Sequence, residues 1–187
     1  ISLIILCYVV FLKLLGMTCI FKNMFGVSCP GCGMTRACIS ALTFNDLKNR
    51  RLMDVKFDWD SALSFDGATG PYVQNAHVRL CSIMRKAGYS VKLSEVNFSE
   101  LTDDSAYELI KLLARKGEKI LSACEMEEPS VLAQYALELS EAAHRFIHND
   151  RVLGSAEEKS RLYLVQSAQC VMENVLDLLG LFPIRQM

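Results

Sequence analysis

Beyond residue 70, apolar side chains recur three and four positions apart and do not alternate with polar ones. This spacing puts the apolar side chains on one face of an α-helix, whereas a half-buried strand would show alternation. A helix with one apolar face buries that face against other helices. The sequence therefore predicts an all-α fold, a bundle of four helices at about residues 71–87, 103–124, 129–148 and 155–179.

The ends of these helices carry recognisable signals. Pro71 suits the first position of a helix, where its missing N–H group is not needed. Gly88 and Gly180 suit the left-handed conformation that ends many helices. Ser155 and Glu158 have the spacing of a capping box, in which each side chain accepts a hydrogen bond from a free backbone N–H group. These signals predict where the first and last helices of the bundle begin and end.

The first 42 residues differ in composition from the rest. They contain no Asp or Glu, whereas all 21 carboxylates follow. Residues 1–21 are almost wholly apolar, and a helix of that length spans the roughly 30 Å hydrocarbon core of a bilayer. Lys13 would oppose insertion by about 2.5–3.5 kcal/mol. We expect a membrane-inserted helix, with a signal peptide or a buried soluble helix as alternatives. Because the first residue is Ile, we expect the natural chain to begin earlier.

Cys29 and Cys32 lie in the motif CPGCGMTRA, which allows three interpretations. A structural zinc site needs four ligands, and the second pair available, Cys19 and Cys38, has no common zinc-knuckle spacing. A redox dithiol is favoured by a helix after the first cysteine, but no strand pattern surrounds this motif. We expect a Pro-Gly turn between the apolar helix and a short second helix. A small cysteine-based metal or redox protein centred on Cys29 and Cys32 is the alternative.

The rest of the chain offers few candidates for chemistry. It contains no glycine-rich phosphate loop and no Ser-His-Asp spacing. His144 and His148 stand four residues apart, as two metal ligands on one helical turn would, but no third ligand accompanies them. The charged stretch before Gly70 has no long periodic run and is predicted to be a connector. Chemistry therefore does not follow from the bundle itself.

The string FDWDSALSFDGATGPYVQNAHVRLCSIMRKA resembles the segment of class I arginyl-tRNA synthetases that leads from the catalytic domain into the anticodon-binding domain. Two later strings, EPSVLAQYALELSEAAHRFIHNDRVLG and RLYLVQSAQCVMENVLDLLGL, are similar to the helical bundle of that family, which is named for its DALR motif. The resemblance covers residues 43–187. It implies a connector at 43–70, similar to the end of the catalytic region, and an anticodon-binding bundle at 71–187.

The N-terminal part resembles another family. CPGCGMTRA, placed after an apolar segment and the string FKNMFG, is similar to a family of short, uncharacterised bacterial membrane proteins. This resemblance covers residues 1–42 and places the join between the two families near Ala41–Phe44. The join has three possible origins: a genuine gene fusion, a degraded gene or an assembly error.

The synthetase resemblance implies recognition of the tRNA for arginine. In that family, a catalytic domain with HIGH-like and KMSKS-like signatures activates arginine with ATP and Mg²⁺, and neither signature occurs in this sequence. We therefore expect no catalytic residue, metal or cofactor in this chain, and no aminoacylation by it alone. We expect a monomer whose synthetase part is cytoplasmic, with membrane attachment if residues 1–21 insert. A membrane-tethered helical module that binds RNA or protein is the alternative.

Five residues match positions that contact tRNA in the family. Tyr72 offers a ring on which an unstacked base can lie, and Arg79 offers a guanidinium for a phosphate or a base edge. Asn75 stands where the family usually has Tyr, so an amide would replace one stacking contact. Arg151 belongs to the RVLG motif, and Met187 is the terminal residue that reaches the anticodon region in the family. The preceding FPIRQ departs from the family's usual ending.

Overall fold

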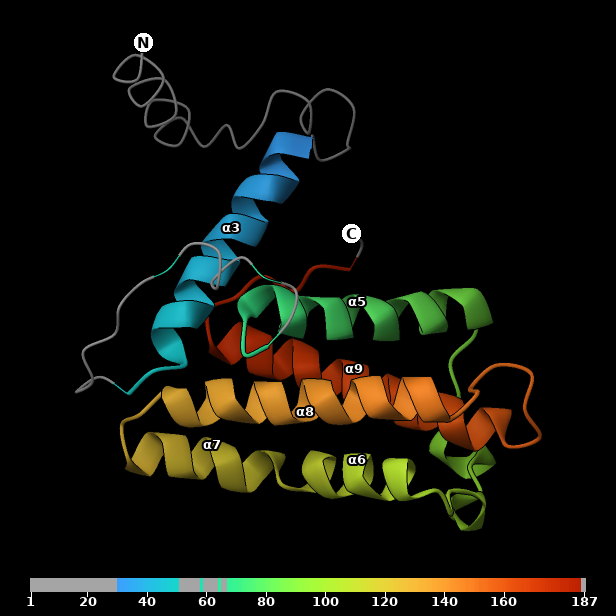
Figure 1. Cartoon of the computed structure of the whole chain (residues 1–187). Helices are drawn as coiled ribbons and strands as arrows, with labels where there is room; N and C mark the ends of the chain where they lie inside the picture. Colours follow the sequence, from blue (N-terminus) through green and yellow to red (C-terminus); the bar gives the residue numbers. More distant parts are fainter. Residues whose placement is uncertain (1–29, 51–57, 59–63, 65–66, 186–187) are drawn as a thin grey trace. The chain divides into compact units, whose positions relative to one another are not determined.

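The computed structural model describes residues 30–50, 58, 64 and 67–185. The regular elements in this part of the chain are helices, as the apolar spacing predicts, and it contains no strand. The chain divides into two compact units, residues 1–39 and 40–187. The helices are α3 (Pro30–Leu47), α5 (Gly70–Ala87), α6 (Asp104–Ala114), α7 (Lys116–Glu125), α8 (Ser130–Asn149) and α9 (Glu158–Leu178), with the 3-10 turns η1 (Leu93–Glu95) and η2 (Phe98–Glu100) between α5 and α6 (Figure 1).

Helix α3 begins at Pro30, so the turn expected at the CPGCG motif is wrong for residues 30–33. The first helical position favours proline, because its φ is already helical and its missing N–H group has no partner there. Cys29, the side chain of Cys32 and the membrane helix expected at residues 1–21 lie outside what the structure describes.

None of the described helices is both long enough and apolar enough to cross a bilayer.

The second half of α3 packs into the bundle. Ala41 and Phe44 are 1% and 0% exposed. A Cβ atom added to Gly70 would lie 2.9 Å from the Cα atom of Ala41 and 3.1 Å from the Cβ atom of Phe44. Glycine is the residue that permits so close an approach, because the nearest neighbour is backbone and cannot move aside. The join expected near Ala41–Phe44 therefore falls in the part of α3 that packs against the start of α5.

The bundle has three layers, with α5 in one, α8 and α9 in the middle, and α6 and α7 in the third (Figure 1). Helix α8 contacts all four of the other bundle helices. Its wide apolar face, predicted from the sequence, supplies Tyr135, Leu139 and Phe146, all fully buried. Burial of such side chains contributes about 1.5–3 kcal/mol each, so α8 is the main source of the hydrophobic core.

Both ends of α5 confirm the signals in the sequence. Thr69 caps the helix, because its hydroxyl accepts a hydrogen bond from the Tyr72 N–H group at 3.2 Å, and Pro71 lies in the first turn. Gly88 ends the helix in the left-handed region, with φ of 74°. A side chain is disfavoured at that φ, so glycine fixes the end of α5.

The single helix expected at 103–124 is two helices, α6 and α7. They meet at Arg115, where ψ is 0° and the N–H group bonds the Leu112 carbonyl at 3.1 Å, one residue closer than in an α-helix. The hydroxyl of Tyr135 donates to the same carbonyl at 2.9 Å. Gly117 lies two residues later, in the first turn of α7, and has a low helix propensity. A buried tyrosine on another helix thus stabilises the break, and sequence spacing does not reveal it.

The capping box expected at Ser155 and Glu158 is wrong. Helix α9 begins at Glu158, three residues late, and the Ser155 hydroxyl donates instead to the Val152 carbonyl at 3.3 Å. The Glu158 carboxylate accepts bonds from the Gly154 N–H group at 2.6 Å and from the Tyr89 hydroxyl at 2.5 Å. Gly154 lies in the loop before α9 and Tyr89 lies in the segment after α5. The Glu158 carboxylate therefore bonds to these two residues and does not cap the helix together with Ser155.

Candidate nucleic-acid interface

Tyr72 and His144 bring two rings together on neighbouring helices. Tyr72 lies in the first turn of α5 and His144 in the second half of α8. Their ring centroids are 5.0 Å apart and the ring planes are tilted by 52°. Both side chains are half-buried. This spacing is within the range of favourable aromatic pairs, so each ring limits the movement of the other.

Arg79 completes this cluster from α5. Its Nη1 atom lies 3.4 Å from Nδ1 of His144. A guanidinium has only donors, so Nδ1 must be the acceptor, and the proton of the neutral ring is then on Nε2. The Tyr72–His144–Arg79 cluster therefore contains two rings and one cation whose arrangement requires a neutral histidine.

The surroundings of the cluster favour neutral rings. Burial lowers the pKa of His144, the positive charge of Arg79 lowers it further, and a hydrogen bond with the Tyr72 backbone opposes both. Burial also raises the pKa of Tyr72, helped by Glu141 and opposed by Arg145 and Arg79. Both shifts favour the uncharged form of each ring near neutral pH.

The other residues expected to contact tRNA lie apart from this cluster. Asn75 is half-buried on α5, and its side chain makes no hydrogen bond within the described part of the chain. Arg151 is exposed after the end of α8, and its Nε atom donates to the Leu153 carbonyl at 3.1 Å in its own loop. Met187 lies outside the described residues. The roles expected for these residues stay predictions.

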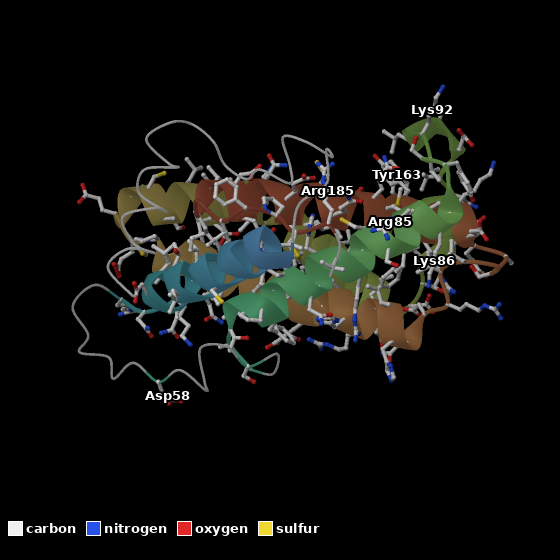
Figure 2. All side chains as sticks on the ribbon, turned by 90° about the horizontal axis from the view of Figure 1, so that it is seen from above. Asp58, Arg85, Lys86, Lys92, Tyr163 and Arg185 are labelled. Atoms are coloured by element: carbon white, nitrogen blue, oxygen red, sulfur yellow. The ribbon has the colours of Figure 1, made fainter. Side chains whose placement is uncertain are left out.

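Helix α5 lies in a segment without acidic residues, although the chain as a whole has net charge −1. No Asp or Glu occurs at residues 67–94, which contain Arg79, Arg85, Lys86 and Lys92, all exposed. Figure 2 shows Arg85 and Lys86 at the C-terminal end of α5, and Lys92 beyond it. We call residues 67–94 the acid-free segment. Nucleic acid affinity rests on cations near phosphates, so this segment is the electrostatically suitable part of the bundle.

Two buried polar residues of α5 hold the C-terminal segment, residues 181–185. The Gln74 side chain donates to the Phe182 carbonyl and accepts from the Ile184 N–H group, both at 3.0 Å. His77 donates from Nδ1 to the Ile184 carbonyl at 2.8 Å. Gln74 and His77 are 2% and 0% exposed, so these bonds satisfy groups that burial would otherwise leave unpaired.

A charged contact continues the same arrangement. Arg85 donates to the Arg185 carbonyl at 2.9 Å, and the Arg185 guanidinium pairs with Glu173 of α9 at 2.7 Å. Figure 2 shows Arg185 lying between α5 and α9. The C-terminal segment is therefore fixed along the helix that carries Tyr72 and Arg79.

Sequence reasoning missed three of these residues. The spacing of His144 and His148 suggests only a metal ligand, and the pairing of α5 with α8 that brings His144 to Tyr72 and Arg79 is not visible from spacing. Gln74 and His77 are polar residues three apart on the buried face of α5. A polar pair on an apolar helical face is the signal that a buried backbone segment needs partners there.

The described residues contain no group of three or more His, Cys, Asp or Glu that could hold a metal ion. The Mg²⁺ that the resemblance assigns to an intact synthetase thus has no such ligand group among the described residues.

Comparison with known families covers most of the bundle. Residues 73–187 match the DALR anticodon binding domain family. The chain belongs to this family. The all-α bundle and the resemblance inferred from its sequence strings are thereby confirmed for this region.

Similar proteins are arginine–tRNA ligases. The enzyme of Alkaliphilus metalliredigens is 38% identical over 145 residues, which are 76% of this chain and 25% of that protein. The enzyme of Clostridioides difficile is 37% identical over 145 residues, again 76% of this chain and 25% of that protein. The structure of Thermus thermophilus arginyl-tRNA synthetase aligns with TM-score 0.77 and 32% identity over 91% of this chain and 30% of that one. The structure of Plasmodium falciparum arginyl-tRNA synthetase aligns with TM-score 0.74 and 28% identity, over 89% of this chain and 29% of that one.

The chain spans about a quarter of the length of these curated relatives. Residues 19–46 match a different family, described as a protein of unknown function (DUF2752). That range includes the CPGCGMTRA motif and ends one residue before the end of α3. The membrane character expected for this part stays a prediction.

Proposed function

We propose that this chain recognises the anticodon arm of arginine tRNA, as the C-terminal part of an arginyl-tRNA synthetase. The observation that carries the proposal is the Tyr72–His144–Arg79 cluster in a chain of the DALR family. Anticodon bases lie in a single-stranded loop, where they can leave the stack and be bound one at a time. A ring pair beside a guanidinium suits one such base and its phosphate.

Charge supports the same partner. The acid-free segment supplies Arg79 to the cluster and carries Arg85 and Lys86 in the last turn of α5 and Lys92 after it, while all 21 carboxylates of the chain lie outside the segment. A phosphate backbone would therefore approach α5 rather than the acidic remainder of the bundle. Asn75, Arg151 and Met187 are further contacts in this proposal, on the family resemblance alone.

Aminoacylation belongs to the proposal only for the intact enzyme. The chain covers about a quarter of its ligase relatives. Activation of arginine with ATP and Mg²⁺ would take place in the part of such an enzyme that this chain does not span. We therefore assign recognition of tRNA, and no catalytic step, to the residues present.

Binding of labelled tRNA transcripts to the full chain, followed by fluorescence anisotropy, tests the proposal. We expect arginine tRNA to bind more tightly than a tRNA for another amino acid, with an affinity that falls as salt rises. Tyr72→Ala should weaken binding about tenfold through loss of stacking. Arg79→Gln should weaken binding and reduce the salt slope by about 1.

Arg115→Gln is the matched control. Arg115 lies between α6 and α7, in the layer farthest from α5, and pairs with Glu118. Its substitution should leave tRNA binding unchanged. Equal affinity for both tRNAs would contradict the proposal.

A further inference from the structure

We propose that His144 is a positioning residue for tRNA recognition: it fixes the guanidinium of Arg79 and joins its ring to that of Tyr72 to form one platform for an unstacked base. This inference rests on the proposed function and adds to it a residue that neither the motif nor the family match assigns. His144 lies on α8, whereas Tyr72 and Arg79 lie on α5. The platform therefore exists only when the two helices are packed together.

The first step of the argument concerns Arg79. Its side chain is exposed, and within the described part of the chain its hydrogen-bond partner is Nδ1 of His144, 3.4 Å away. A long exposed side chain samples many rotamers, and ordering it opposes binding. A partner that holds the guanidinium in place before RNA arrives removes part of that penalty. Arg79 would then be preorganised beside the rings.

The second step concerns the rings. Tyr72 is only half-buried, and its ring lies against His144 with centroids 5.0 Å apart. A ring that a second ring already holds in position loses less freedom of movement when a base stacks on it. His144 thus serves two neighbours at once: its ring contacts Tyr72 and its Nδ1 atom accepts from Arg79.

The third step concerns charge. A protonated imidazole has two donors and no acceptor, so it cannot accept a hydrogen bond from Arg79. The charged groups around the cluster are Arg79 from α5 and Glu141 and Arg145 from α8, so two cations and one carboxylate face it. Addition of a third positive charge would drive the guanidinium of Arg79 away. The platform therefore requires neutral His144, in agreement with its lowered pKa.

Three substitutions separate the two contacts of His144. His144→Phe keeps a ring against Tyr72 and removes the acceptor. His144→Asn keeps an acceptor near the position of Nδ1 and removes the ring. His144→Ala removes both. We expect each of the first two to weaken binding of an arginine tRNA transcript to the full chain by about threefold to tenfold, and the third by more.

A double-mutant cycle excludes a merely structural role. Arg79→Gln should weaken binding strongly in the wild-type chain, but much less in the His144→Phe chain, where Arg79 is no longer held. In the His144→Asn chain, the effect of Arg79→Gln should return toward its wild-type size. Circular dichroism of each variant checks that the helices are intact, and His144→Asn remains informative if His144→Phe does not fold.

The free protein gives an independent readout. The ¹⁵N shifts of the imidazole should assign the neutral ring of His144 to the Nε2–H tautomer, and Arg79→Leu should shift the ring toward the tautomer mixture of free histidine. The ratio of affinities for arginine tRNA over another tRNA should decrease as pH falls through the pKa of His144. In the His144→Phe chain this ratio should not change with pH, because the titrating ring is absent. The ratio is measured because added positive charge strengthens binding to both tRNAs alike, and that effect cancels in it.

The outcomes distinguish this inference from the proposed function. If the wild-type chain does not prefer arginine tRNA, both are wrong. If the wild-type chain shows that preference, but the cycle gives additive effects or the ring is the Nδ1–H tautomer, the role of His144 alone is wrong.

Discussion

Truncation of Phe44 tests whether the second half of α3 packs as part of the bundle. Phe44 is 0% exposed and packs at the point where Gly70 meets α3. Phe44→Ala removes a whole buried ring and leaves a cavity, which destabilises proteins by about 3–5 kcal/mol. In a domain of this size, 1 kcal/mol shifts the melting temperature by about 2–4 °C, so we expect a decrease of about 6–20 °C.

Urea denaturation of the full chain, followed by circular dichroism, measures the free energy of unfolding. Phe182→Ala is the matched control, because that side chain is 64% exposed and should change stability by less than about 0.5 kcal/mol. Gly70→Ala tests the same contact from α5. Its Cβ would lie 2.9 Å from the Ala41 Cα atom, so we expect a loss of about 1–3 kcal/mol from overpacking.

A loss below about 1 kcal/mol for Phe44→Ala would refute the reasoning, because a fully buried ring cannot be removed so easily. Stabilisation by Gly70→Ala would refute it too, since that is the result when alanine replaces glycine in a helix with free space.

Three further changes test contacts inside the bundle. Gln74→Leu removes two buried hydrogen bonds to the C-terminal segment, so unfolding by urea should lose about 2 kcal/mol and amide exchange in that segment should accelerate. Arg161→Leu removes the 2.8 Å ion pair with Asp103 and should lower the unfolding free energy by about 2 kcal/mol, whereas an unchanged midpoint would contradict its role. Burial, with help from Glu138 and against Arg115, raises the pKa of Tyr135 to about 12 from its ordinary value of 10. The folded state thus holds the neutral phenol, so this contribution to stability is full below pH 10 and is lost as pH rises toward 12; alkaline melting curves of Tyr135→Phe should lack that loss.

Much of the fold follows from local pattern. The apolar spacing identifies the α5 and α8 helices almost to the residue, and Gly88 and Gly180 end their helices with φ of 74° and 70°. These features are predictable because a helix face and a left-handed cap depend on residues a few positions apart. The break at Arg115 depends on Tyr135, twenty residues later, and so lies beyond any local pattern.

The candidate site divides in the same way. Tyr72 and Arg79 could be inferred from the resemblance, because both lie on one helix at a recognisable distance from Pro71. His144 could not, since its place between them depends on how α5 and α8 pack. The CPGCG motif was misleading because proline and glycine favour both turns and the first turn of a helix, and the structure has the helix.

Transfer of the anticodon loop between tRNAs tests the central claim most directly. The loop of arginine tRNA is placed in a tRNA that the full chain binds weakly, and the affinity of the chimaera is measured by competition. If the chain reads the anticodon arm, the chimaera should bind about as tightly as arginine tRNA, and Tyr72→Ala should abolish the gain. Affinity that follows the body of the tRNA, whatever its anticodon loop, would contradict the account.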